Sequence, residues 1–242
     1  MKDTTLKSLD ELCDRYRTTM EVMETGATNA IRDEGRAYGG FIRMAKGKFQ
    51  EWLTQRLVEI TWESELGESK TRLEINSKKI PIPIQMDYVG NLQNTVVKAH
   101  LEKNQEQYKY GLSVDKHVFI DNRFVLGIES KAYTENAMIK RILVDFYLLK
   151  TKHPDLACFL FQLESQLGGD YSSELKNPMG SPATHTLMSY FKDVQLNIVT
   201  LLEGERKVDR PINDPNFFKE LKREHLEVAV DNLLATLKPF EK

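Results

Sequence analysis

The sequence predicts an α/β protein in which a mixed central β-sheet is flanked by helices, with extra helices at both ends. Three observations predict it: helical apolar patterns open and close the chain, a hairpin of apolar strands occupies the middle, and a helix and a buried strand follow that hairpin. Strand, crossover helix and strand form a right-handed parallel unit, so the sheet should contain antiparallel and parallel pairs. The 242 residues, 40% of them hydrophobic, suit a single domain over 1–242.

Two helices are expected in the N-terminal part of the chain. Over residues 4–24 apolar side chains recur with helical spacing, and Gly26 is expected to end that helix. Residues 27–40 contain three glycines and are expected to form a loop or a short helix. A second helix is expected over residues 41–61, where apolar side chains form one broad face.

The middle of the chain is expected to be extended. Residues 71–90 alternate in polarity and contain two prolines, which fits an edge strand. The polar stretch 91–109 is expected to hold a loop or a short helix. Two apolar strands, 112–120 and 123–132, then follow as a hairpin.

A helix and a buried strand are expected after the hairpin. Thr134 is a suitable N-cap for a helix over residues 135–151, and His153-Pro154 should stop it. The continuous apolar run 156–163 has the length of a central buried strand.

The C-terminal part is expected to begin with a long loop and to end in helices. Residues 165–184 are rich in glycine, serine and proline. Helical patterns follow over 185–203 and 214–238, and the second opens on Asp214-Pro215, an N-cap followed by a proline.

Composition and motifs exclude several classes of protein. No apolar run reaches the ~18 residues that a membrane span needs, and no signal peptide is recognisable, so we expect an intracellular, cytoplasmic protein. Cys13 and Cys158 have no metal-ligand spacing and are expected to be idle thiols. No zinc, P-loop or dinucleotide motif occurs, which argues against a nucleotide cofactor. The net charge of −2 counts mildly against a nucleic-acid binder, although a cleft can be locally basic.

One group of residues in the hairpin points to chemistry. Glu129 and Lys131 share a strand face because side chains alternate along a strand. The opposite face should be the core, and it carries Phe124, Leu126 and Ile128. A glutamate and a lysine that point together from a strand with an apolar back are placed at the surface of a cleft. The alternative is a solvent-facing ion-pairing set.

Asp115 is the expected partner carboxylate, and its position depends on the hairpin register. A three-residue loop over 121–123 would place Asp115 directly opposite Glu129. A two-residue turn would pair Asp115 with Ile128 and turn it to the wrong face, unless a β-bulge intervenes.

These residue types suit hydrolysis of a phosphodiester. Mg²⁺ takes hard oxygen ligands, so two carboxylates and the Ser130 backbone carbonyl can hold it together with substrate phosphate oxygens. Lys131 can orient the attacking water and add positive charge beside the phosphorus.

The segment Val114-Asp115, together with Glu129 and Lys131, resembles the motif of the PD-(D/E)xK nucleases, with Val114 in place of the usual proline. Among that family the chain looks most like the type II restriction endonucleases, over a catalytic core of about residues 41–164. The resemblance implies that Asp115 and Glu129 are metal ligands and that Lys131 is the catalytic lysine.

Such enzymes often add an acidic residue from an upstream helix. We favour Glu51, with Glu59 and Glu63 as the other possibilities. Asp87 is a rival of Asp115 for the first carboxylate, although it lies forty-one residues before Glu129.

Two stretches are expected to contact DNA. The first is the basic segment with Arg43, Lys46 and Lys48. The second is the polar loop in the recognition region 165–242, whose side chains can read base edges: Gln166, Asp170, Ser172, Ser173, Lys176 and Asn177. The alternatives are a solvated face and an ordinary connecting loop.

The resemblance therefore predicts a Mg²⁺-dependent, sequence-specific endonuclease that cuts double-stranded DNA as a homodimer. The amphipathic segments 4–24 and 214–238 are candidate dimer surfaces, and intramolecular core is an equally good interpretation of them. The alternatives are a nuclease of DNA repair or recombination with the same fold, and an α/β binding protein that is not an enzyme.

Overall fold

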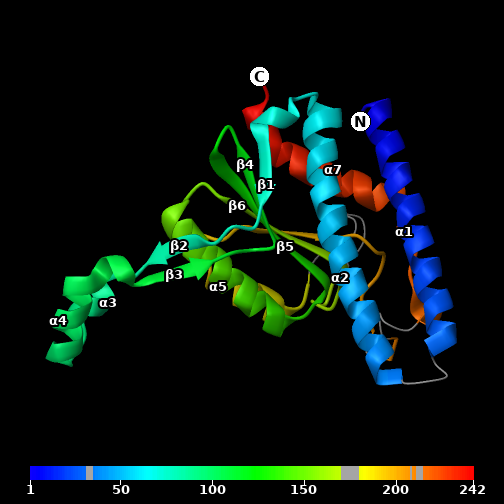
Figure 1. The fold of residues 1–242 in the computed structure, drawn as a ribbon. Helices are drawn as coiled ribbons and strands as arrows, with labels where there is room; N and C mark the ends of the chain where they lie inside the picture. The colour runs from blue at the N-terminus through cyan, green and yellow to red at the C-terminus, as the bar shows by residue number, and fades with distance from the viewer. Residues whose placement is uncertain (31–34, 170–179, 208, 211–214) are drawn as a thin grey trace.

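A five-stranded mixed sheet forms the centre of the computed structural model (Figure 1). The structure describes residues 1–30, 35–169, 180–207, 209–210 and 215–242. Within these ranges, the side chains of residues 24–44 and 215 are not described. In spatial order the strands are β1 (Leu73–Asn76), β4 (Lys116–Ile120), β5 (Arg123–Thr134), β6 (Ala157–Ser165) and β7 (Leu196–Thr200). The first three pair antiparallel and the last three pair parallel, which confirms the predicted mixed sheet.

Helices cover both faces of this sheet. On one face lie α1 (Asp3–Ala30), α2 (Gly35–Glu59) and α7 (Arg223–Leu237) (Figure 1). On the other face lie α5 (Asn136–Lys152) and α6 (Pro182–Ser189). The apolar sides of α1 and α7 are buried in the core, and the two helices contact each other. Of the two interpretations of these segments, the structure therefore shows intramolecular core.

The N-terminal helices are longer than the sequence pattern predicts. The expected end at Gly26 is wrong, because α1 continues to Ala30. One glycine inside a helix costs about 1 kcal/mol, which is less than the packing of the five buried apolar side chains of α1: Leu9, Leu12, Tyr16, Met20 and Met23. Helix α2 begins at Gly35, before the expected residue 41, and continues into a π-helical segment over Ile60–Leu66.

The expected helix over 185–203 is wrong. Helix α6 ends at Ser189, and β7 follows as the strand that pairs in parallel with β6. The β-branched run in the second half of β7 fits a pleated surface better than a helix, and β6 offers it an edge to pair with. The last helix begins at Arg223 and not at residue 214. Pro215 starts a 3₁₀ turn instead, and Asp214 lies outside the described residues.

Thr134 does not cap α5. The N-cap residue is Glu135, and no side chain caps this helix. Thr134 is still part of β5, where it pairs with Ser165, so it is not free to act as a cap. The C-terminal end of α5 at His153 agrees with the prediction.

The hairpin of β4 and β5 has a two-residue turn and a β-bulge. Ile120 pairs with Arg123, so the three-residue loop is excluded, and the other alternative, a two-residue turn with a β-bulge, is the one observed. Both turn residues, Asp121 and Asn122, have positive φ angles of 48° and 66°, as a tight type I′ turn requires. The register then shifts between Val118 and Phe119, and Val118 pairs with Leu126. Lys116 therefore pairs with Ile128, and the extra residue restores the register in which Asp115 follows opposite Glu129.

The prediction that Phe124, Leu126 and Ile128 share one core face of β5 is wrong, because of the bulge. Phe124 packs on the α5 side of the sheet, whereas Leu126 and Ile128 pack on the α1, α2 and α7 side. The extra residue reverses the alternation between Phe124 and Leu126. Both faces of β5 are thus covered by helices.

The predicted strand over 112–120 is divided in two. Its first residue closes β3 (Lys109–Leu112), which pairs with β2 (Ile80–Pro83) in a separate two-stranded sheet. This pair carries α3 (Met86–Gly90) and α4 (Thr95–Asn104) away from the central sheet as an arm (Figure 1). Within the described parts of the chain, no helix is long and apolar enough to cross a membrane.

Candidate active site

Asp115 lies in the short link between β3 and β4, and two neighbours fix that link. The side chain of Val114 is buried in the core beside α5. Its backbone N–H donates a hydrogen bond to Nε2 of His117 at 3.1 Å, and the His117 side chain is itself fully buried. The residue before Asp115 is therefore held both by the packing of its side chain and by a hydrogen bond of its backbone N–H.

The Asp115 carboxylate forms a hydrogen bond with β5 just beyond the last pair of the β4–β5 ladder. Its Oδ2 accepts the backbone N–H of Ser130 at 2.7 Å and also contacts Nζ of Lys131 at 3.1 Å. Asp115 and Glu129, predicted to face each other across the hairpin, are thus brought together around Lys131.

Three oxygen atoms converge on the ammonium group of Lys131. Nζ forms ion pairs with Oδ2 of Asp115, at 3.1 Å, and with Oε2 of Glu129. It also donates to the backbone carbonyl of Ser130 at 3.2 Å. The two carboxylates and the carbonyl that the sequence suggests as metal ligands therefore surround one cationic group.

Burial and charge both act on these groups. Burial, followed by the negative charge of Asp115, raises the pKa of Glu129 to about 7, although Lys131 opposes this rise. Burial alone would lower the pKa of Lys131, but the charges of Glu129 and Asp115 outweigh it and raise that pKa. The pair therefore favours a charged lysine, and Glu129 gains a proton more readily than an exposed glutamate.

The residues present fit a hard divalent cation. Carboxylate and carbonyl oxygens are the ligands that Mg²⁺ prefers, and one or two carboxylates suffice when water and phosphate complete its shell. The Lys131 ammonium already occupies the point at which these oxygens meet. No group of three or more His, Cys, Asp and Glu side chains in the described residues forms a metal site, so the carbonyl matters to the donor set.

Helix α2 packs against β5 at Ser130, whose side chain lies on the opposite face of the strand from those of Glu129 and Lys131. Oγ1 of Thr54 lies 3.3 Å from Oγ of Ser130. Glu51 precedes Thr54 by three residues, or about one helical turn, and is half-buried. The other two glutamates lie further along the helical segment: Glu59 forms an ion pair with Arg56, and Glu63 is in the π-helical part.

Asp145 is a site residue that sequence reasoning missed. It lies on α5, forms an ion pair with Arg141 at 3.7 Å, and interacts electrostatically with Glu129 and Lys131. Burial raises its pKa. Its position three residues after the core residue Ile142 was the available signal, because such spacing turns a side chain toward the core.

The other predicted residues lie apart from this group or outside the description. Asp87 belongs to α3 in the arm, whereas Asp115 contacts Lys131, so the geometry favours Asp115 as the first carboxylate. Lys48 is exposed on α2. Lys46 is only 2% exposed, and its Nζ lies 3.8 Å from the centre of the Phe218 ring. Burial lowers the pKa of Lys46 to about 8.

The polar loop over 165–184 is described only at its ends. Gln166 is half-buried, and its Oε1 accepts a hydrogen bond from Nη1 of Arg206 at 2.6 Å. Five predicted DNA contacts lie outside the described residues, namely Asp170, Ser172, Ser173, Lys176 and Asn177; the side chain of Arg43 does so too.

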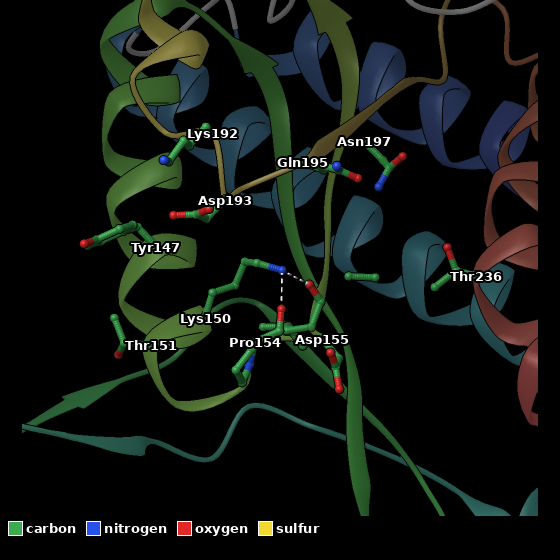
Figure 2. A pocket seen from close by; sticks show the side chains of 12 residues that line it. Tyr147, Lys150, Thr151, Pro154, Asp155, Lys192, Asp193, Gln195, Asn197 and Thr236 are labelled. Atoms are coloured by element: carbon green, nitrogen blue, oxygen red, sulfur yellow. Dashed lines mark hydrogen bonds between the residues drawn. The ribbon is translucent and has the colours of Figure 1, made fainter.

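A hollow of about 770 Å³ lies at the other end of the parallel strands (Figure 2). It is lined by residues from α5, the start of β6, the segment 192–197 and α7. Lys150 crosses it and donates to the backbone carbonyls of Pro154 and Leu156 at 2.6 and 3.0 Å. None of Asp115, Glu129 and Lys131 lines this hollow, so it is separate from the candidate site.

Comparison with known proteins gives one close relative. Over 237 residues the chain is 64% identical to a protein described as "Type II restriction enzyme DdeI" from Desulfomicrobium norvegicum, and the alignment covers 98% of this chain and 99% of that relative. No family model and no solved structure matches the chain.

Proposed function

Because the chain belongs to the type II restriction enzymes, and is therefore a site-specific deoxyribonuclease, we propose that Asp115, Glu129 and Lys131 are its catalytic residues. One observation carries this proposal: the two carboxylates, which come from opposite sides of the β4–β5 hairpin, meet at the ammonium group of Lys131. The close relative speaks against the two alternatives, a repair nuclease and a protein without enzymatic activity.

The finer assignment is to the PD-(D/E)xK nucleases. It is supported by the order of the elements around the residues: a hairpin that carries both carboxylates, then α5, then the parallel strand β6. The bulge in β5 supports it further, because it places Asp115 and Glu129 at the same level of the hairpin.

The cofactor that we propose is Mg²⁺. Asp115, Glu129 and the carbonyl of Ser130 would hold it, in agreement with the three oxygens that now surround Lys131. When bound, such an ion stabilises charge on the phosphoryl oxygens and lowers the pKa of a water molecule. Lys131 contributes a positive charge and a hydrogen-bond donor that orients the attacking water.

Helix α2 and the recognition loop would bring DNA to this centre. Glu51 is proposed as the upstream acidic residue, since it lies one turn from Thr54, which contacts Ser130. Lys48 is exposed on the same helix and is available to a phosphate group. The side chains in and around residues 165–184 would read the bases.

A homodimer is proposed because a duplex has two strands to cut. One set of Asp115, Glu129 and Lys131 is present in each chain, so two copies related by a two-fold axis would provide one centre for each strand.

The proposal is tested by incubating the protein with plasmid DNA and Mg²⁺, and by repeating this with Lys131→Ala and Glu129→Ala. Discrete fragments from the native protein, lost in both variants, support the assignment. Fragments produced equally well by both variants would place the catalytic centre elsewhere.

A further inference from the structure

The ammonium group of Lys131 occupies the position that the proposed metal ion needs. It contacts Asp115, Glu129 and the Ser130 carbonyl together. A divalent cation and an ammonium group repel each other and compete for the same oxygens. Lys131 must therefore move within the site when the metal ion binds, and it then needs a new hydrogen-bond acceptor.

Gln162 offers such an acceptor on the neighbouring strand. Lys131 of β5 and Gln162 of β6 are register partners in a parallel pair, so both side chains point to the same face of the sheet. Adjacent strands lie about 4.8 Å apart, which both of these long side chains can bridge.

The side chain of Gln162 is fully buried and only half satisfied. Its Nε2 donates to Oγ1 of Thr200 at 3.0 Å, so the amide is held from the β7 side. Its Oε1 is buried and accepts no hydrogen bond within the described residues. A buried polar atom without a partner costs free energy and is uncommon in proteins, so it calls for an explanation.

We propose that Gln162 is a positioning residue that accepts the ammonium group of Lys131 when the metal ion takes its place among the three oxygens. Thr200 holds the Nε2 atom of the amide from the β7 side, which leaves Oε1 available to the ammonium group. Lys131 then stays beside the metal ion, where it can act on the attacking water, and does not compete with it. This inference rests on the proposed metal site.

The test measures Mg²⁺ binding to the DNA-free protein by titration calorimetry. Gln162→Met keeps the bulk of the side chain but removes Oε1 and Nε2. Thr200→Val is the matched control, because it removes the same hydrogen bond between Gln162 and Thr200 but leaves Oε1 in place. Each variant is also made with Lys131→Met, which removes the ammonium group, and thermal unfolding of each variant checks the fold.

Gln162→Met is expected to weaken Mg²⁺ binding on the order of tenfold, the size of effect that loss of one hydrogen bond to a charged group has. In the Lys131→Met background it should have no effect, because there is no ammonium group left to place. Thr200→Val should change binding by less than about threefold, since a neutral hydrogen bond contributes less.

Three results would overturn the role of Gln162. The first is an equal loss of Mg²⁺ affinity with and without Lys131, and the second is an equal loss in Thr200→Val. The third is an effect of Asp145→Asn, and not of Gln162→Met, that depends on Lys131, because Asp145 would then be the acceptor of the ammonium group. If the methionine variant does not fold, Gln162→Leu gives the same comparison. Unchanged Mg²⁺ binding in Asp115→Asn and Glu129→Gln would instead refute the proposed metal site itself.

Discussion

Asp115 accepts the backbone N–H of Ser130 at 2.7 Å, just beyond the point where β4 stops pairing with β5. The last pair in the ladder is Lys116 with Ile128, so the N–H of Ser130 has no partner strand on this side. The carboxylate takes the place of that strand and at the same time binds Lys131. One side chain therefore ends the hairpin and joins Lys131 to it.

A larger residue at Gly127 is expected to destabilise the protein. A Cβ atom there would lie 2.9 Å from Cε1 of Phe146, which is fully buried, and 3.5 Å from Cγ2 of Val114. Gly127→Ala should lower the free energy of unfolding by about 1–3 kcal/mol, because the packed core of α5 must shift. Urea unfolding followed by circular dichroism measures this change.

Gly47→Ala is the control for that substitution. Gly47 lies inside α2, and a Cβ there would meet no atom within 4 Å. Alanine should stabilise the protein by about 0.5–1 kcal/mol through its better helix propensity. Equal effects of the two alanines would contradict the close approach of β5 and α5.

His117 is expected to make stability fall in acid. Burial, followed by the charge of His153, lowers the pKa of His117 from 6.5 to about 4. The unfolded chain therefore takes up a proton near pH 6.5, whereas the folded chain does so only near pH 4. Stability is fully present above pH 6.5 and is lost as the pH falls toward 4, by on the order of 2–3 kcal/mol.

His117→Phe removes this titration and the acceptor for the Val114 N–H. Its unfolding free energy, measured in urea between pH 4 and pH 7, should depend less on pH than that of the native protein. Identical pH slopes for the two proteins would show that His117 does not titrate in this way.

Glu129 is expected to make metal binding depend on pH. Burial and the charge of Asp115 raise its pKa to about 7, and a metal ion binds the deprotonated carboxylate. Mg²⁺ binding should therefore weaken about tenfold from pH 8 to pH 6, as the carboxylate becomes protonated. Calorimetry at both pH values measures this, and equal affinities at pH 6 and pH 8 would argue against the raised pKa.

The sequence could predict the order of elements in the middle of the chain but not every register. The antiparallel hairpin, the crossover helix α5 and the parallel strand β6 follow from apolar patterns and are observed. The sequence did not decide whether β5 contains a bulge, because Val125 and Leu126 are both apolar and either can face the core. Only packing against helices on both faces decides between the registers.

Other features depend on contacts that a single sequence does not contain. Strand β7 is specified by its pairing with β6 as much as by its own residues. The candidate carboxylates were predicted, and the structure brings Asp115 and Glu129 to Lys131. Asp145 and Gln162 were missed as neighbours of Glu129 and Lys131, because they lie on a helix and a strand whose patterns indicated only core.

Cleavage by a matched pair of aspartate variants tests the central claim most directly. Asp115 and Asp121 belong to the same hairpin region, but Asp121 lies in the turn and pairs with Arg72. Single-turnover cleavage of plasmid DNA with Mg²⁺ should be at least about 100-fold slower for Asp115→Asn, because the centre loses a proposed metal ligand and a partner of Lys131. Asp121→Asn should cut within about fivefold of the native rate. Cleavage at the native rate by Asp115→Asn would contradict the account.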